Sequence, residues 1–469
     1  MSLQPCCRVL LFGVSALVLG CTAPADGAKT DSDSDTGAPD DTGTGDTDTA
    51  GDTSTLPTVA FSDLTITADP DVPTILTVTW TTDPATTGFV AFGETTAYGG
   101  STAPEPAPTT AHSAVVHGLA AATTWHLRPM GDGEGGLDQV WTTAAAPSAL
   151  PILSVSGDPA ALGGYLLLPI TGATYAVAIV DGQGRYVWWH EAEEGYLVTR
   201  AVLSRDGASV IYTQVATQDY GPDGHLVRVP LDGGEPTILE VPYLTHDFVE
   251  LPDGTLACLT KDLRDNVVGD RIVEYAPDGT RSVVWSAFDY FDPAAYEIDE
   301  SDGTWTHANA LDYDEAEDAW YISLRNLDTI LKSDRASRQL LWRLMPDEPN
   351  FRYVGGATPT ENQHQFELLP DGGLLVFDNG GESTGSSRVV EYALDETANT
   401  ATEAWSYSAT PPLYVYALGD VDRLEDDRTL VTWSTAGLVQ VVEADGTEVW
   451  RLGVELGHVF GYTERLTGF

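Results

Sequence analysis

Cysteine and positive charge are both scarce in this sequence of 469 residues. Lys and Arg together number 22, against 71 Asp and Glu, so the formal net charge at pH 7 is −49. The stretch at 22–56 contributes only nine of these acids, so the rest of the chain is acidic as well. A surface of this sign repels the phosphate backbone, which excludes nucleic acid as a partner. An anionic ligand would have to rely on a local cluster of cationic and donor groups.

The apolar run near the N-terminus is too short to cross a bilayer. It extends from Val9 to Leu19 after Arg8, which suits the core of a secretory signal rather than a transmembrane helix. The residues VLGC at 18–21 resemble a bacterial lipobox, in which the Cys becomes the lipid-modified N-terminus. We therefore predict a signal peptide over 1–20 and a lipid anchor on Cys21. The anchor would hold the protein to a membrane of the bacterial cell envelope, in the periplasm or at the cell surface; an ordinary cleaved signal is the alternative.

The cysteines do not predict a disulfide. Cys6 and Cys7 lie in the predicted signal peptide and Cys21 would carry lipid, which leaves Cys258 alone. Its neighbours in LACL at 256–259 are apolar, so we expect Cys258 to be a buried strand residue rather than a nucleophile.

The segment 21–56 has few side chains that could build a core. It consists almost entirely of Asp, Thr, Ser, Gly and Ala, as in TDSDSDT at 30–36. Such a composition cannot bury enough apolar area to offset its ordering entropy, so we predict a solvated, disordered tether. Its alternating Asp residues resemble a calcium loop, but the Gly and the distant Glu of such loops are missing in register.

The sequence pattern of residues 57–146 predicts a small β-sandwich. The run LTVTW at 76–80 alternates apolar and polar residues as a half-buried strand does. The run LAAATTW at 119–125 resembles the fibronectin type III signature, with Trp125 where a Tyr is usual. About 90 residues is also the right size for that sandwich. The segment shows no catalytic constellation, so we expect a spacer or docking module.

From residue 147 onward the chain repeats a two-part pattern, and its first part is a turn before a strand. The Asp-Gly pair in these turns supplies the positive φ that a β-hairpin needs. The turns are SRDG at 204–207, LPDG at 251–254, LPDG at 369–372 and the degenerate LEDD at 424–427.

The second part is a strand that ends in Trp in all but one case. These strand ends are RYVW at 185–188, SVVW at 282–285, QLLW at 339–342, TEAW at 402–405, EVW at 448–450 and, without Trp, PTILEV at 236–241. Their spacing of roughly 45–63 residues is the size of a propeller blade. No useful helical periodicity interrupts them. We predict an all-β chain in which 147–469 forms a six-bladed β-propeller.

Three of the nine histidines recur at the blade spacing. His246, His307 and His364 are separated by 61 and 57 residues, and equivalent positions in successive blades converge on the propeller axis. A lone strand His is more often a core residue, but three at this spacing, with Arg325 between them, favour a site. Imidazole suits nucleophilic or proton-transfer work near neutral pH, and the guanidinium fork suits a tetrahedral oxyanion. Asn309 follows His307 by two residues, so we expect it to share the same strand face and to donate to the same anion.

A metal site is the competing interpretation of the three histidines, since three His leave an open coordination position on zinc or copper. No Asp or Glu motif accompanies them, and Arg325 would place a positive charge beside a cation. We therefore predict neither a metal nor another cofactor.

Several short motifs surround these residues in a fixed order. They are THAN at 306–309, SLRN at 323–326, QH at 363–364, FDNG at 377–380 and SRVVEY at 387–392. Jointly they resemble the arylsulfotransferase family, the bacterial aryl-sulfate sulfotransferases that use no nucleotide sulfate donor. The resemblance is strongest over about 244–392 and continues weakly toward the C-terminus.

The resemblance implies a six-bladed propeller and a set of site residues. The family histidine that is transiently sulfated falls on His364, and the other polar site residues fall on His246, His307, Asn309 and Arg325. Some family members carry a disulfide near the site, and this chain departs from them.

Two other sulfate chemistries are excluded by the residues. None of the three Lys follows a Gly, so there is no loop to cradle a nucleotide phosphate. Cys258 is followed by Leu-Thr-Lys, so it lacks the Pro two residues later that a formylglycine sulfatase requires.

The predicted reaction is a double displacement between two small partners, an aryl sulfate donor and a phenolic acceptor. His364 attacks sulfur, Arg325 and Asn309 bind the sulfuryl oxygens, and His246 and His307 orient the ester oxygen and move its proton. A non-catalytic cell-surface propeller that binds a ligand is the alternative. A quinone-dependent dehydrogenase is disfavoured, because its metal-binding acids and tryptophan repeats are not seen.

Overall fold

The computed structural model describes most of the chain beyond the N-terminal segment. The described ranges are 58–216, 221–298, 303–346, 350–381 and 384–468. The predictions of a signal peptide over 1–20, a lipid anchor on Cys21 and a tether over 21–56 lie outside them.

The described residues form an all-β structure. Strands are joined by turns and by five short 3-10 helices, and the described ranges contain no α-helix. No helix in the described part of the chain has the length and apolar character needed to cross a membrane.

Two antiparallel sheets cover the region between residues 60 and 142. One sheet contains β1 (Ala60–Ala68), β2 (Leu76–Thr86) and β5 (Thr109–Val116); the other contains β3 (Gly88–Gly93), β4 (Gly100–Ser101), β6 (Thr124–Gly131), β7 (Glu134–Gly135) and β8 (Gln139–Thr142). The alternation predicted for 76–80 is confirmed, because Leu76, Val78 and Trp80 are buried while the residues between them are partly exposed.

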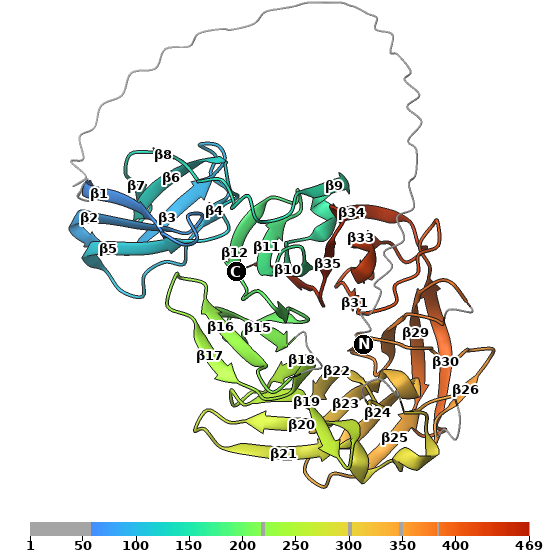
Figure 1. Ribbon diagram of the computed structural model, residues 1–469. Coiled ribbons are helices and arrows are strands. Elements are labelled where there is room, and N and C mark those ends of the chain that lie inside the picture. The colour runs from blue at the N-terminus through green and yellow to red at the C-terminus, as the bar shows by residue number, and fades with distance from the viewer. Residues whose placement is uncertain (1–57, 217–220, 299–302, 347–349, 382–383, 469) are drawn as a thin grey trace, which may run out of the picture. The chain divides into compact units, whose positions relative to one another are not determined.

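Six further sheets follow along the chain, and Figure 1 shows them around a common centre. The first contains β10 (Tyr165–Gly172), β11 (Ala176–Asp181) and β12 (Tyr186–Glu191), with β35 (His458–Phe460) and β36 (Glu464–Leu466). The second contains β13 (Tyr196–Leu197), β14 (Ala201–Leu203), β15 (Ser209–Ala216), β16 (His225–Pro230) and β17 (Thr237–Glu240). The third contains β18 (Leu244–Glu250), β19 (Leu256–Arg264), β20 (Val267–Tyr275) and β21 (Arg281–Ser286).

The remaining sheets repeat this pattern. The fourth contains β22 (Ala308–Asp314), β23 (Ala319–Leu324), β24 (Thr329–Asp334) and β25 (Leu340–Leu344). The fifth contains β26 (Arg352–Val354), β27 (Phe366–Leu368), β28 (Leu374–Asp378), β29 (Arg388–Asp395) and β30 (Thr400–Tyr407). The sixth contains β31 (Asp420–Arg423), β32 (Thr429–Trp433), β33 (Leu438–Val442), β34 (Glu448–Val454) and β9 (Leu153–Gly157).

Strands from distant parts of the chain complete the first and the sixth of these sheets. The C-terminal strands β35 and β36 pair with β10, and β9 pairs with β34. Residues near 155 and residues near 460 are therefore held together, so the ring of sheets does not depend on sequence neighbours alone.

The repeat predicted from the sequence is confirmed element by element. The turns end in residues with positive φ, which are Gly207 (70°), Gly254 (81°), Gly372 (85°) and, in the degenerate turn, Asp427 (66°). Every segment predicted as a strand end overlaps a strand; these strands are β12, β17, β21, β25, β30 and β34. Cys258 is fully buried in β19, as expected, and burial raises the pKa of its thiol.

Candidate active site

The three histidines at blade spacing meet in space. His246 lies in β18, His307 directly precedes β22, and His364 lies two residues before β27. The ring centroid of His246 is 4.9 Å from that of His307 and 6.2 Å from that of His364. The convergence predicted from the spacing of 61 and 57 residues is thus confirmed.

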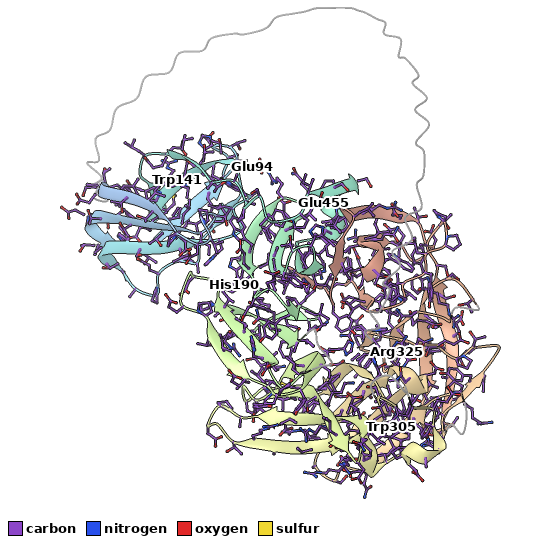
Figure 2. All side chains as sticks on the ribbon, in the orientation of Figure 1. Glu94, Trp141, His190, Trp305, Arg325 and Glu455 are labelled. Carbon is purple, nitrogen blue, oxygen red and sulfur yellow. The ribbon has the colours of Figure 1, made fainter. Side chains whose placement is uncertain are left out.

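These imidazoles line one pocket with a volume of about 440 Å³. Arg325, labelled in Figure 2, lines the same pocket from the turn that follows β23. The other lining residues are Thr171, Leu197, Thr199, Thr304, Asn326, Tyr416, Ala417 and Leu418. The pocket therefore combines a guanidinium and three imidazoles with apolar and aromatic walls.

The backbone at His307 is left-handed, with φ of 51°. The amide of Arg325 donates to the carbonyl of His307 over 3.1 Å, and the amide of Asn326 donates to that of Thr306 over 3.2 Å. These two bonds join the backbone segments that carry the imidazole and the guanidinium.

A buried carboxylate holds the other side of the same segment. Asp270 Oδ2 accepts from the hydroxyl of Thr306 at 2.6 Å and from the amide of Ala308 at 2.8 Å. Its other oxygen lies 3.3 Å from the ammonium of Lys261, which is itself buried. His307 is therefore bracketed by two anchored neighbours.

Asn309 does not share the face of His307, so the expectation drawn from strand alternation fails. The left-handed residue at 307 and a register shift between Ala308 and Ala310 interrupt the alternation. Asn309 is fully buried and is not among the residues lining the pocket; its Nδ2 donates to the carbonyl of Gln363 over 2.7 Å. Its contact is with the backbone just before His364, not with the space where an anion would bind.

The hydrogen bonds of His364 define its tautomer. Its Nδ1 lies 2.7 Å from Oδ1 of Asn379 and 3.2 Å from the carbonyl oxygen of Asn362. Both partners are acceptors, so Nδ1 carries the proton and Nε2 carries the lone pair.

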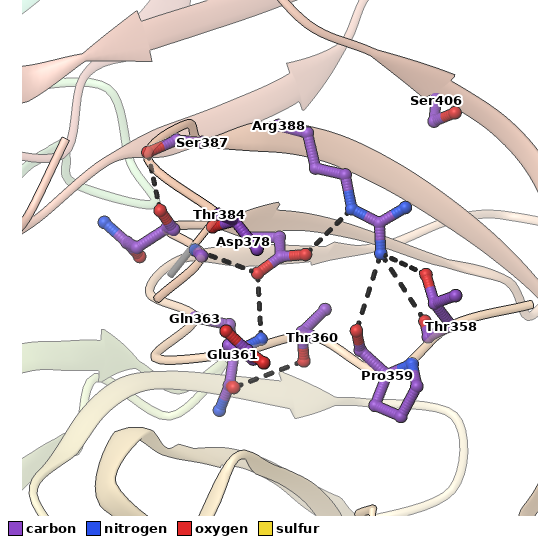
Figure 3. A network of polar contacts seen from close by, with 12 residues as sticks. Thr358, Pro359, Thr360, Glu361, Gln363, Asp378, Thr384, Ser387, Arg388 and Ser406 are labelled. Carbon is purple, nitrogen blue, oxygen red and sulfur yellow. Dashed lines mark hydrogen bonds and ion pairs between the residues drawn. The ribbon is translucent and has the colours of Figure 1, made fainter. Parts of the chain in front are cut away.

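The turn before His364 is held by an ion pair between the buried Asp378 and the half-buried Arg388 (Figure 3). Asp378 accepts from the amides of Glu361 at 2.9 Å and Gly380 at 3.1 Å, and from Nε of Arg388 at 2.8 Å. Arg388 also donates to the hydroxyl of Thr358 over 2.8 Å. This network fixes the chain before the histidine and the start of the loop that follows β28.

The motif SRVVEY at 387–392 therefore has a supporting role here. Besides Arg388, the hydroxyl of Ser387 donates to the carbonyl of Asn379 over 2.7 Å, and the hydroxyl of Tyr392 donates to the carbonyl of Thr358 over 2.5 Å. Glu391 pairs with Arg423 over 2.5 Å. None of these residues lines the pocket.

Burial keeps the imidazoles neutral. Desolvation lowers the pKa of His364 to about 3, and the pKa values of His246 and His307 fall well below their usual range for the same reason. The charges of Arg325 and Lys261 lower the pKa values of His246 and His307 further. A neutral imidazole offers a lone pair at neutral pH, which is what a nucleophile needs. Within the described ranges, no group of three or more His, Cys, Asp or Glu is placed to hold a metal ion.

The sequence analysis did not predict four residues in or around the pocket. Asn379 lies in the motif FDNG, which marked the segment but not the side chain that meets His364. Tyr416 reaches the pocket from a segment without any distinctive pattern. Lys261 and Asp270 lie on adjacent strands and carried no motif that would single them out.

Solved structures with low sequence identity resemble parts of the chain. A periplasmic gluconolactonase from Pseudomonas aeruginosa is 15% identical, with 72% of this chain and 94% of that chain covered and a TM-score of 0.39. A β-propeller domain from Myceliophteria thermophila is 12% identical, with 67% and 96% covered and a TM-score of 0.40. Virginiamycin B lyase from Staphylococcus aureus is 12% identical, with 64% and 87% covered and a TM-score of 0.35.

No curated protein matches the sequence. The model of the family "Arylsulfotransferase (ASST)" matches residues 165–451, which is more than half of the chain and includes the four residues His246, His307, Arg325 and His364. The chain belongs to the arylsulfotransferase family and is, at that level, a sulfotransferase.

Proposed function

We propose that this protein transfers a sulfuryl group from an aryl sulfate ester to a phenol, without a nucleotide donor, through a transient sulfohistidine at His364. The observation that carries the proposal is the neutral, buried imidazole of His364, protonated on Nδ1 and lining the same pocket as Arg325. Family membership supports sulfotransferase activity; the substrates and the covalent step belong to the proposal.

In the first step the lone pair of His364 Nε2 attacks the sulfur of the donor. An N–S bond forms, the bond between sulfur and the aryl oxygen breaks, and its electron pair leaves with the phenolate. The ring then carries a positive charge and keeps its proton on Nδ1. A phenol has a pKa near about 10, so its anion is a competent leaving group, and protonation by solvent completes its release.

In the second step a phenolic acceptor takes the place of the first product. Its oxygen attacks sulfur and gives up its proton as the new O–S bond forms. The N–S bond breaks and its electron pair returns to Nε2, which restores the neutral imidazole. His246 and His307 orient the reacting aryl oxygen and relay the proton of the acceptor to solvent, which balances the proton that the phenolate of the first step takes up. Their lowered pKa values suit relaying a proton rather than storing it.

The lining of the pocket supports this division of work. Arg325 offers several N–H donors in a planar fork, which matches the oxygens of a sulfuryl group. Leu197, Tyr416 and Leu418 offer an apolar and aromatic wall for the ring of a donor or acceptor. Because Asn309 donates to the carbonyl of Gln363, Arg325 is the main anion-binding residue, and Asn309 supports the backbone before His364.

We also propose the organisation in which this reaction takes place. The six sheets between residues 147 and 469 are the blades of the propeller, and the two sheets within 57–146 are a fibronectin type III-like module. Residues 1–20 are a signal peptide, and 21–56 form a lipidated tether at Cys21. The enzyme then works in the cell envelope, on small aryl sulfates and phenols, attached to a membrane by its lipid.

Burst kinetics with a chromogenic aryl sulfate test the proposal. Mixed with donor alone, the protein should release one equivalent of phenol rapidly and then stop, and an added phenol should restart turnover. His225→Ala is a matched control that removes a buried histidine outside the pocket, so its burst should be unchanged. Neither burst nor transfer with several acceptors would favour the non-catalytic binding module instead.

A further inference from the structure

We propose that Asn379 is a positioning residue that holds His364 in the tautomer with its proton on Nδ1 and its lone pair on Nε2, and that it also fixes the pocket wall beside the ring. This inference rests on the proposed function, because it matters for catalysis only if Nε2 of His364 is the attacking atom.

The orientation of the Asn379 amide is determined by its own partners. Its Nδ2 donates to the carbonyl of Val415 and to that of Leu418, both over 2.8 Å. Carbonyls only accept, so the NH₂ group must face them, and Oδ1 must face His364. An acceptor at 2.7 Å then requires the proton on Nδ1 of the imidazole. Asn379 is fully buried, so water does not compete for these bonds.

An amide suits this place better than a carboxylate would. A carboxylate beside the ring would stabilise the imidazolium, whose two nitrogens are both protonated and which therefore has no lone pair to attack sulfur. The amide oxygen orients the ring without adding a charge, and burial keeps His364 neutral. The Nδ1 proton need not move at any stage, since sulfation and desulfation both take place at Nε2.

The same side chain connects the nucleophile to the substrate-facing wall. Val415 and Leu418, which receive the two amide hydrogens, bracket Tyr416 and Ala417, and residues 416–418 line the pocket. Ser387 completes the arrangement: its hydroxyl donates to the Asn379 carbonyl over 2.7 Å and accepts from the Val415 amide over 2.9 Å. The ring of His364 and the wall beside it are thus positioned by one residue.

The test combines spectroscopy with pH profiles on the full-length protein labelled with ¹⁵N-histidine. Two-bond ¹H–¹⁵N correlation spectra distinguish protonated from bare ring nitrogens, and His364→Gln identifies the signal of His364. In the wild type we expect a proton on Nδ1 and a kcat that is flat between about pH 5 and 8, since no group at the nucleophile titrates there. A proton on Nε2 in the unreacted wild type overturns the inference without any variant.

Two substitutions and one control separate positioning from simple support. Asn379→Ala leaves only the carbonyl of Asn362, 3.2 Å away, to accept from Nδ1. The variant should therefore give a mixture of tautomers and lower kcat by roughly 2- to 10-fold, because part of the population lacks the lone pair at Nε2. Asn379→Asp should introduce a titration, so that kcat rises with pH as the imidazolium loses its proton. Tyr392→Phe, which removes a hydrogen bond to Thr358 and touches neither His364 nor Asn379, should leave the tautomer and the flat profile intact.

The results also separate this inference from the proposed function. An unchanged tautomer in Asn379→Ala, or equal changes of tautomer and profile in Tyr392→Phe, would overturn the positioning role even if sulfate transfer proceeds through His364. The tautomer is read in unreacted protein, so the expected spectra in a protein without sulfate transfer would uphold the positioning and reject the function.

Discussion

His246 and Asp247 are consecutive residues on β18, yet they belong to two clusters of buried and half-buried titratable groups with different chemistry. The histidine cluster consists of His246, His307, Arg325 and His364 and lines the pocket. The acidic cluster surrounds Arg200 and consists of Asp247, Asp312, Glu367, Asp420, Asp422 and Glu464.

Hydrogen bonds to backbone amides hold Asp247, at the centre of the acidic cluster. Asp247 accepts from the amides of Phe248 and Leu311, both at 2.9 Å, and from the side chain of Gln365 at 3.0 Å. Nε of Arg200 lies 3.7 Å from Oδ1 of Asp247. The acids come from β18, β22, β27, β31 and β36, which belong to five different sheets. They therefore bind sheets to one another.

Desolvation acts on both clusters with opposite signs. It lowers the pKa values of the histidines and raises those of the acids, to about 7 for Glu367. In both cases the neutral form is favoured. A neutral histidine gains a reactive lone pair, whereas a neutral acid loses a charge that would destabilise the fold. Equivalent positions on the inner strands thus serve reactivity in one cluster and stability in the other.

Apart from the loss of His364 itself, we expect the largest loss of kcat in the histidine cluster for Arg325→Lys. Lysine keeps the charge but loses the planar fork that matches the sulfuryl oxygens, so kcat should fall by about 10³-fold while the free energy of unfolding changes little. Steady-state kinetics and thermal unfolding measure both quantities. Arg205→Lys, at a half-exposed ion pair with Glu315, is the matched control and should leave both unchanged. A kcat equal to that of the wild type in Arg325→Lys would show that catalysis does not need the guanidinium.

Glu367→Gln probes the acidic cluster by its pH dependence. The folded-state pKa is raised above the ordinary value of 4.5, so the folded protein keeps a proton that the unfolded chain loses between about pH 4.5 and 7. The contribution of Glu367 is therefore fully present below that window and is lost as pH rises through it. The glutamine variant is always neutral, so it should match the wild type near pH 4.5 and be more stable at pH 8, by on the order of 2–3 kcal/mol.

Urea unfolding at the two pH values measures the effect of Glu367→Gln, and kcat should stay close to that of the wild type. If the difference in unfolding free energy between the variant and the wild type is the same at both pH values, Glu367 does not titrate in this window. A large loss of kcat would break the assignment of the acidic cluster to stability.

His307→Asn tests a smaller effect in the histidine cluster. Asparagine tolerates the left-handed backbone at this position, so the variant should fold while losing the imidazole. We expect kcat to fall about 10-fold with KM for the aryl sulfate little changed, because the histidine helps to move a proton rather than to hold the anion. A rise in KM with unchanged kcat would make His307 a binding residue instead.

The sequence predicts the parts of the fold that depend on local patterns. Asp-Gly turns and Trp-ended strands recur at a spacing that only a repeated sheet explains, and that spacing brings His246, His307 and His364 together. The completion of the first sheet by β35 and β36 was not predicted, because it depends on pairing between residues nearly 300 positions apart, such as Ile170 and Phe460.

The candidate site was predictable in its residue types but not in its details. The expectation for Asn309 failed because a left-handed residue and a register shift interrupt the alternation of the strand, and neither has a clear sequence signature. The hydrogen-bond partner of His364 was also not predicted, because the motif FDNG does not indicate which of its side chains contacts the imidazole. Tyr416 reaches the pocket from an irregular segment, where periodicity gives no guidance.

Mass spectrometry of the protein incubated with an aryl sulfate and no acceptor shows whether His364 carries the sulfuryl group between donor and acceptor. We expect an added sulfuryl group on the peptide that contains His364, labile in acid, lost when a phenol is added and missing in His364→Ala. Sulfate transfer by a wild-type protein whose His364 peptide stays unmodified, together with an active His364→Ala variant, would contradict this role of His364.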